Sequence, residues 1–555
     1  MRHISIAVAA VALAITLAAP LQAEKPEAQR PNILLIVADD LGYADIGPFG
    51  GEIATPNLDA LARRGLRLDQ FYTSPACSPT RAMLLTGRDN HEIGLGSMAE
   101  VLTDQQRGKP GYEGYLSRKV PTLAERLHSA GYVTMMSGKW HLGKAAGLTP
   151  VDRGFDRSFA LLQGAHNHFG LDQSPAYRAY GASVDYRLDG AVTEWPTGGY
   201  SSDIFTDRMI EFLKDAPKGR PFFGYLAYTA PHWPLQAPAE DIARYHGRYD
   251  AGPAVLRRER VLRMKALGIA AAFAPWTELS SAWNRLSADA RAIESRKMEV
   301  YAAMVDRMDQ NIGRIIALLA QRGELDNTII LFMSDNGADA LVLGQPLNPN
   351  NVNEPMKVPL DNRLANLGAG DSYFSYGPEW AAASSGPFAG EKGLTTEGGI
   401  RAPAILAGPG IRPGASNALL HVLDIMPTML SLARATETAD KARNGRDWTA
   451  LLHGETHAVR RADEPVNWEL FYRGAVRNGN MKAVYLPNRI PLFGKITEPG
   501  SVQWQLYDIA KDPGETHNLA EKKPGILRKL QQLWKQYVVA TGVVTLPEED
   551  PGTAP

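Results

Sequence analysis

A single cysteine, Cys77, stands among the 555 residues of this chain, within the stretch "SPACSPTRAMLLTGR". Ser78, Pro79 and Gly87 suit the N-cap, the first turn and the exit of a short helix. The pattern therefore predicts that the thiol lies at the positive end of a helix dipole. Arg81 adds a full positive charge one turn further on. We expect a thiol in this place to have a lowered pKa and to be reactive.

Oxygen-bearing side chains follow two apolar runs. Asp39 and Asp40 end "NILLIVADD", and Asp335 and Asn336 follow "TIILFMS". Either pair alone would more simply cap a turn, but both pairs at strand ends favour a site for a hard cation such as calcium or magnesium. The thiolate of Cys77 would be a poor ligand for such a cation and prone to oxidation outside the cytoplasm.

Other polar side chains also follow apolar runs. Lys139 and His141 follow "VTMMSG", and His232 follows "YLAYTAP". Ligands of open α/β sheets bind beyond the carboxyl ends of the strands, so these residues are candidates for one shared site. His166 and His168 have a spacing that could bind a metal, but no further nitrogen or sulfur ligand is evident. We expect them in a loop or pocket wall.

The elements that must position these residues alternate between buried strands and amphipathic helices up to about residue 430. This alternation predicts an α/β fold for residues 31–460, with a mostly parallel central sheet flanked by helices. Two tracts interrupt it, an Arg-rich helical one near 254–295 and an irregular one near 341–395, and such tracts are often functional covers. We expect the arginines near 257–263 to lie on a solvated helix face.

The pattern changes in the last part of the chain. Residues 461–555 are predicted to form a smaller α+β domain with an antiparallel sheet. The stretch "NWELFYRGAVRNGNMKAVYL" has a turn at Asn478 and Gly479 between strand-like arms, "VQWQLYDI" is a third strand, and "GILRKLQQLWKQYVVA" is a terminal helix.

The first 23 residues have the layout of a signal peptide: Arg2 and His3, an apolar run, and a small-residue site that ends at Ala23. The apolar run is shorter than the roughly 20 residues of a membrane span. We therefore expect the export machinery to deliver a periplasmic or secreted protein with no membrane segment after cleavage. Lys and Arg number 59 against 60 Asp and Glu, which argues against a polybasic surface for nucleic acid or membranes.

The stretch "CSPTRAMLLTG" resembles the signature of the sulfatases, a formylglycine-dependent family in the alkaline-phosphatase-like superfamily, and the chain is most similar to the bacterial arylsulfatases. Cys77, Pro79 and Arg81 complete the pattern C-x-P-x-R, in which a formylglycine-generating enzyme oxidises the cysteine. The resemblance continues through "PNILLIVADDLGYADIG", "GKWHLG", "APHWP", "SDNG", "GGIRAP" and "LYDIAKDPGETHNLA".

This resemblance implies a site residue by residue. One calcium ion would be held by Asp39, Asp40, Asp335, Asn336 and an oxygen of residue 77. Arg81, Lys139 and His141 would surround the aldehyde hydrate, and His232 and Lys392 would face the sulfate.

The implied reaction is the hydrolysis of small sulfate monoesters, with aryl sulfates expected, by a sulfuric ester hydrolase. One hydroxyl of the hydrate, with Asp335 as base, attacks sulfur while the alcohol leaves, and the other then expels sulfate with His141 as base. His232 or Lys392 would protonate the leaving oxygen, and the cations would stabilise charge on the transferred group.

Two other functions remain open from the sequence. Hydrolases of phosphonate monoesters or phosphodiesters resemble this chain and use the same modified cysteine. A catalytically silent protein that binds sulfated glycans is the second alternative, and an unmodified Cys77 would favour it. The sequence does not identify the alcohol half of the substrate.

Overall fold

The computed structural model describes residues 30–546 apart from 180–183, 270–273, 281, 349–350, 436–443 and 488–502. The predicted signal peptide, residues 1–23, lies outside the described residues. Within the part of the chain that is described, no helix combines the length and the apolar character needed to cross a membrane.

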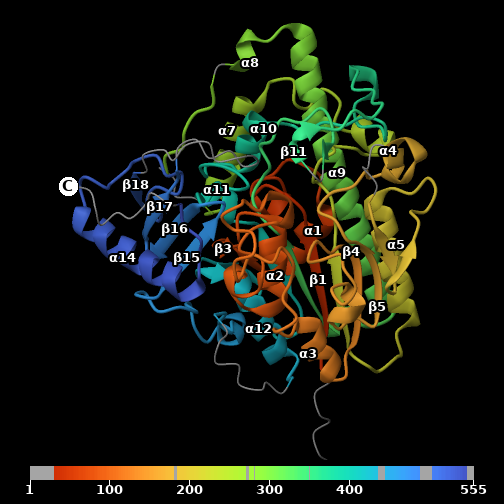
Figure 1. Ribbon diagram of the computed structural model, residues 1–555, viewed down its shortest axis with the longest axis horizontal. Coiled ribbons are helices and arrows are strands. Elements are labelled where there is room, and N and C mark those ends of the chain that lie inside the picture. Colours follow the sequence, from red (N-terminus) through yellow and green to blue (C-terminus); the bar gives the residue numbers. More distant parts are fainter. Residues whose placement is uncertain are drawn as a thin grey trace, which may run out of the picture.

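A ten-stranded sheet forms the centre of the molecule (Figure 1). In spatial order its strands are β13 (Gly414–Ser416), β2 (Leu66–Leu68), β12 (Ala404–Ala407), β9 (Thr328–Ser334), β1 (Asn32–Ala38), β8 (Phe222–Ala227), β4 (Val133–Lys139), β5 (Arg157–Leu161), β6 (Tyr186–Leu188) and β7 (Ala191–Thr193). The five strands from β9 to β5 are mutually parallel, whereas β12, β6 and β7 pair antiparallel with their neighbours. The predicted α/β fold with a mostly parallel sheet is confirmed.

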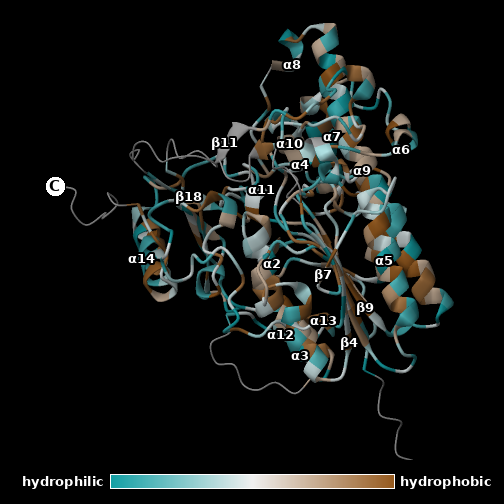
Figure 2. Cartoon of the chain, turned by 45° about the vertical axis from the view of Figure 1, so that its right-hand side comes forward, coloured by the Kyte–Doolittle hydropathy of each residue, from teal (hydrophilic) through white to brown (hydrophobic). Residues whose placement is uncertain are grey.

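Helices cover both faces of this sheet (Figure 2). One layer consists of α1 (Pro56–Arg64), α5 (Ser201–Asp215) and α9 (Ala288–Gln321), and the other of α2 (Cys77–Thr86), α3 (Leu123–Ser129) and α12 (Ile425–Leu432). On β1, Leu34 and Ile36 belong to the core beneath the first layer, while Ile33 and Leu35 belong to the core beneath the second. Burial of both faces explains why this strand is apolar at every position after Asn32.

The prediction that the arginines near 257–263 all lie on a solvated helix face is wrong for two of them, Arg257 and Arg260. This tract lies in α7 (Pro253–Ala266), but the Arg260 side chain is fully buried and bonds Asp45 at 2.5 Å and Glu52 at 2.7 Å. Arg257 is buried as well. Asp45 and Glu52 come from the loop after β1, so the charges that pair with Arg260 are more than 200 residues away in sequence. Arg257 instead donates to the carbonyls of Gly386 and Thr277.

Shorter elements complete the large domain. They are β3 (Phe71–Tyr72), β14 (Leu420–His421), β10 (Leu347–Asn348), β11 (Asn351–Pro355), α4 (Pro175–Ala179), α6 (Ala239–Ala243), α8 (Ala282–Arg285), α10 (Pro378–Ser384), α11 (Glu397–Ile400) and α13 (Thr449–Leu452).

The C-terminal part forms an antiparallel sheet of four strands covered by a helix, at the left of Figure 1. These elements are β15 (Pro465–Leu470), β16 (Arg473–Asn478), β17 (Met481–Tyr485), β18 (Trp504–Asp508) and α14 (Pro524–Thr541). The prediction missed one hairpin, because the turn between β15 and β16 consists of Phe471 and Tyr472, at φ 55° and 64°. Bulky residues seldom adopt this left-handed conformation, so no sequence signal marked the turn.

Candidate active site

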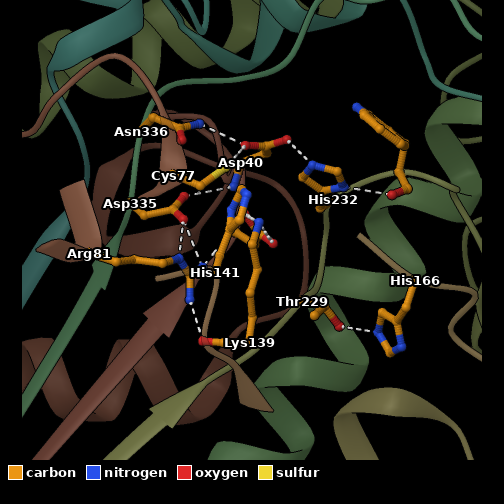
Figure 3. Close-up of polar contacts among 12 residues, drawn as sticks. Asp40, Cys77, Arg81, Lys139, His141, His166, Thr229, His232, Asp335 and Asn336 are labelled. Atoms are coloured by element: carbon orange, nitrogen blue, oxygen red, sulfur yellow. Dashed lines mark hydrogen bonds and ion pairs between the residues drawn. The ribbon is translucent and has the colours of Figure 1, made fainter. Parts of the chain in front are cut away.

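The candidate site lies beyond the carboxyl ends of four neighbouring strands, β9, β1, β8 and β4. Asp39 and Asp40 follow β1, Asp335 follows β9, Lys139 ends β4, and His232 follows β8. Figure 3 shows Asp40 in the middle, with Asn336 and Cys77 on one side and His232 on the other. The parallel sheet thus brings together polar side chains that are up to about 300 residues apart.

Cys77 is the first residue of α2, and Ala76 occupies the N-cap position. The prediction of Ser78 as N-cap is therefore wrong by two residues. The Cys77 side chain is buried, with Sγ 3.9 Å from Asp40 Oδ1. The predicted lowering of the thiol pKa is also wrong: burial raises the pKa of Cys77, and the opposing charges of Lys139 and Lys392 are too weak to reverse this.

Three buried carboxylates and three cations form what we call the active-site charge cluster: Asp39, Asp40, Asp335, Arg81, Lys139 and Lys392. Lys139 Nζ lies 3.0 and 2.8 Å from the two oxygens of Asp39. Arg81 donates to Asp335 Oδ2 from Nε at 3.0 Å and from Nη2 at 2.7 Å. Lys392 Nζ donates to Asp40 Oδ2 at 2.8 Å. Each carboxylate therefore has a cation of its own.

The pKa values of two of these carboxylates, Asp39 and Asp40, are shifted in opposite directions. Burial would raise the pKa of Asp39, but Lys139, His232 and Arg81 together hold it well below its usual range. Burial and the neighbouring carboxylates raise the pKa of Asp40 to about 8, despite Lys392. Negative charge is concentrated around Asp40, which is where a cation would be favoured most.

The donor set fits a hard cation. Asn336 donates from Nδ2 to Asp40 Oδ1 at 2.7 Å, while its own Oδ1 is buried without a hydrogen-bond partner among the described residues. Single ligand atoms of Asp39, Asp40, Cys77 and His232 lie within 4.8 Å of one another. An unpartnered amide oxygen beside converging carboxylates is the environment that calcium or magnesium prefers.

Two histidines flank the cluster from opposite sides. His232 Nδ1 donates to the carbonyl of Trp233 at 2.6 Å, and its Nε2 lies 3.5 Å from Asp40 Oδ2. His141 Nε2 pairs with Glu100 at 3.2 Å, and its Nδ1 is buried without a partner in the described structure. Burial lowers the pKa of both rings.

Backbone strain is concentrated at two of these residues. Asp40 has φ 65° and His141 has φ 56°, in the left-handed region that few non-glycine residues adopt. Such conformations persist where the surroundings fix them, and they cluster at functional sites.

Sequence reasoning missed several supporting residues. Asp339 Oδ2 lies 3.2 Å from Lys392 Nζ and accepts from Trp233 Nε1 at 3.0 Å, and Glu100 holds His141. Asp339 lies two residues after "SDNG" and could have been suspected, but Glu100 lies in a 3-10 turn, Ala99–Val101, for which the sequence has no functional signal.

His166 and His168 form a second layer behind the site. His166 bonds Tyr186 at 2.7 Å and Thr229 at 2.8 Å. His168 Nε2 donates to the carbonyl of His232 at 3.0 Å. Their ring nitrogens therefore make hydrogen bonds within the wall of the site, as the sequence predicted for a loop or pocket wall.

The sulfatase family model matches residues 31–435. An uncharacterized sulfatase of Schizosaccharomyces pombe is 44% identical over 547 residues, which cover 95% of this chain and 96% of the relative. An arylsulfatase of Klebsiella aerogenes is 42% identical over 429 residues, which cover 76% of this chain and 91% of the relative. The solved structure of Ps i-CgsB in complex with k-i-k-neocarrahexaose is similar with a TM-score of 0.66 and 26% identity, covering 94% and 96% of the two chains.

Proposed function

This chain belongs to the sulfatase family, and we propose that it hydrolyses sulfate monoesters, with aryl sulfates as the main substrates. The observation that carries this proposal is the active-site charge cluster beside Cys77. Arg81, Lys139 and Lys392 are buried and held by carboxylates, so they keep their charge where a sulfate group would bind. Fixed positive charge of this kind stabilises the charge that develops on the transferred group.

Conversion of Cys77 to formylglycine would supply a hydrate with one hydroxyl for attack on sulfur and a second for release of sulfate. Around this position, His141 presents a buried and unpartnered Nδ1, which suits it to accept a proton during release. His232 and Lys392 both reach Asp40 Oδ2, and we assign protonation of the leaving oxygen to this pair. Asp335, held by Arg81, is the proposed base for attack.

Calcium bound by Asp39, Asp40, Asp335 and Asn336 together with residue 77 would supply a Lewis acid at the nucleophile. The unpartnered Asn336 Oδ1 and the crowding of carboxylates around Asp40 support this ligand set. The four proposed side-chain ligands other than residue 77 all offer oxygen, and formylglycine would replace the sulfur of Cys77 by oxygen as well, which favours calcium over a transition metal.

The names of the relatives support sulfate esters over phosphonate esters. The Klebsiella relative is an arylsulfatase, and human arylsulfatase A is 27% identical over 573 residues. The complex of Ps i-CgsB with an oligosaccharide makes sugar sulfates the class to compare with aryl sulfates. We further propose that a formylglycine-generating enzyme matures the chain, and that the export machinery carries it to the periplasm or beyond the cell.

Mass spectrometry of the Cys77 peptide tests maturation. After expression with a maturing enzyme, the peptide should have lost one sulfur and two hydrogens and gained one oxygen. Cys77→Ser keeps a single hydroxyl, so it should react once with an aryl sulfate and then stall as a covalent adduct, whereas Cys77→Ala should not react. A free thiol in fully active protein would refute the modification.

Turnover of aryl, alkyl and sugar sulfates beside a phosphonate ester tests the substrate class. We expect the largest kcat/KM for an aryl sulfate. A larger kcat/KM for the phosphonate ester would show that the protein is a phosphonate hydrolase instead. Binding of sulfated glycans without turnover of any ester would indicate the catalytically silent binding protein.

A further inference from the structure

Two segments that carry site residues lie side by side although they are far apart in sequence. We call residues 72–77 the Cys77 segment and residues 392–401 the Lys392 segment. Two backbone hydrogen bonds join them, from Thr73 N–H to Ile400 O (2.8 Å) and from Gly393 N–H to Pro75 O (2.7 Å). The distance between residue 77 and Lys392 therefore depends on how these segments are held.

The Lys392 segment is packed tightly against residues just before it, Ala389 and Gly390. The N–H of Gly398 donates to the carbonyl of Ala389 at 2.7 Å. A Cβ atom on Gly398 would lie 2.2 Å from the carbonyl oxygen of Gly390, which leaves no room for a side chain. Because the loop is this compact, a displacement near its end is transmitted to Lys392.

The C-terminal sheet contacts both segments. Trp468 in β15 donates from Nε1 to the carbonyl of Thr73 in the Cys77 segment at 3.0 Å. Thr395 in the Lys392 segment donates its hydroxyl to the carbonyl of Gly474 in β16 at 3.0 Å. One face of this sheet thus holds both segments in place.

Buried charges lie at the centre of this contact. Lys482 Nζ is 2.9 Å from both Glu397 Oε1 and Glu515 Oε1, and Glu515 Oε2 accepts from the backbone N–H of Glu397 at 2.8 Å. Tyr72 donates to Glu397 Oε2 at 2.7 Å, and Arg477 donates to the Tyr72 hydroxyl at 2.6 Å. We call these five residues the interface charge cluster.

Stability alone does not account for this cluster. Buried ion pairs often contribute no more than apolar side chains of equal volume, because desolvation offsets their attraction. Unlike apolar contacts, hydrogen-bonded ion pairs fix the orientation of the groups that they join. Lys482 holds the side chain of Glu397, and Glu515 holds its backbone N–H. Glu397 is five residues from Lys392.

On the basis of the proposed function, we propose that Lys482 and Glu515 are positioning residues of the active site. They act through Glu397 to set the place of Lys392 relative to residue 77. The C-terminal domain is then a working part of the catalytic centre, although it supplies none of the proposed catalytic side chains.

The test is a set of variants in the mature, full-length protein. Lys482→Met should lower kcat for an aryl sulfate about tenfold to 100-fold, the loss expected for a catalytic group displaced by about 1 Å. Glu515→Gln is the milder variant should Lys482→Met fold poorly, and it should lower kcat less. Lys511→Met, at an exposed position of the same domain, is the matched control and should match the parent.

A double-mutant cycle separates positioning from general damage. In a Lys392→Ala background, Lys482→Met should cause little further loss, because the group that it positions is already gone. An equal loss in both backgrounds, or a parental kcat in folded Lys482→Met and Glu515→Gln, would overturn the proposal. Formylglycine content by mass spectrometry should be the same in every variant.

Failure of the proposed function would give a different result. If the parent turns over no ester, the same cycle is measured on the binding of inorganic sulfate by calorimetry. Weaker binding in Lys482→Met that disappears in the Lys392→Ala background would support positioning without hydrolysis. Absence of sulfate binding by the parent would overturn both proposals.

Discussion

The active-site charge cluster and the interface charge cluster are built from similar parts, yet they differ in how completely those parts are paired. Both are fully buried and both place lysines between carboxylates at 2.8–3.0 Å. At the interface, Lys482 bridges two glutamates. Glu397 also accepts from Tyr72, and Glu515 Oε1, which has no hydrogen bond, is held by its ion pair with Lys482 at 2.9 Å. At the active site, Asn336 Oδ1 and His141 Nδ1 are buried without hydrogen-bond partners among the described residues.

Backbone conformation does not separate the two clusters. Asp40 and His141 have positive φ, and so does Glu515 of the interface charge cluster, at φ 50°. Unpaired polar atoms cost stability, and they are kept where a ligand can use them. The comparison indicates that the active site is arranged for binding and chemistry, and the interface for fixing geometry.

The largest expected effect is on activity at the active site. Asp40→Asn keeps the shape of the side chain but removes a proposed calcium ligand. We expect turnover of an aryl sulfate to fall at least about 100-fold, together with the content of bound calcium. The free energy of unfolding of metal-free protein should not fall, because burial and the neighbouring carboxylates raise the pKa of Asp40, so that ionisation of this group disfavours the folded state.

Turnover assays, elemental analysis of bound metal and urea unfolding measure these three quantities. Turnover and metal content equal to those of the parent would show that Asp40 is not part of the site. A large loss of stability would show that both clusters stabilise the fold, which contradicts the difference drawn between them.

The next effect is on stability at the interface. Lys482→Met leaves the buried charges of Glu397 and Glu515 without their shared cation, so the free energy of unfolding should fall by about 4 kcal/mol. Chemical denaturation followed by fluorescence measures this, with Lys511→Met as control. An unchanged midpoint in Lys482→Met would show that the interface charge cluster contributes no stability.

A smaller, pH-dependent effect is expected at His91, which also lies between the two domains. It bonds Asp89 at 2.8 Å and Glu469 at 2.7 Å, with Tyr112 and Tyr537 packed beside it. Burial opposes the charge, but the hydrogen bonds to Asp89 and Glu469 prevail and raise the pKa of His91 from 6.5 to about 9.

Since this pKa is raised in the folded state, the stabilisation is fully present below pH 6.5 and is lost as the pH rises through 9. It amounts to about 3 kcal/mol. Unfolding free energies measured between pH 6 and pH 10 should fall in the parent and fall less in His91→Gln. Parallel curves for the two proteins would contradict this assignment.

Several features could be predicted from the sequence because they depend on local pattern. Apolar runs such as Asn32–Ala38 are buried on both faces, and the 3.6-residue period over residues 301–323 predicts the C-terminal part of the long helix Ala288–Gln321. The hairpin at Phe471 and Tyr472 could not be predicted, because its turn residues carry none of the usual signals. The roles of the site residues remain predictions that the experiments above can test.

By itself, the sequence determined which polar residues follow which strands, and hence that Asp39, Asp40, Asp335 and Lys139 share one edge of the sheet. Only the tertiary structure decided which charges pair. Arg260 is drawn inward by Asp45 and Glu52, Lys392 is held by Asp40, and burial raises rather than lowers the pKa of Cys77. The physical reason is that strand and helix signals arise from neighbouring residues. Desolvation and ion pairing instead depend on groups that approach only when distant segments pack.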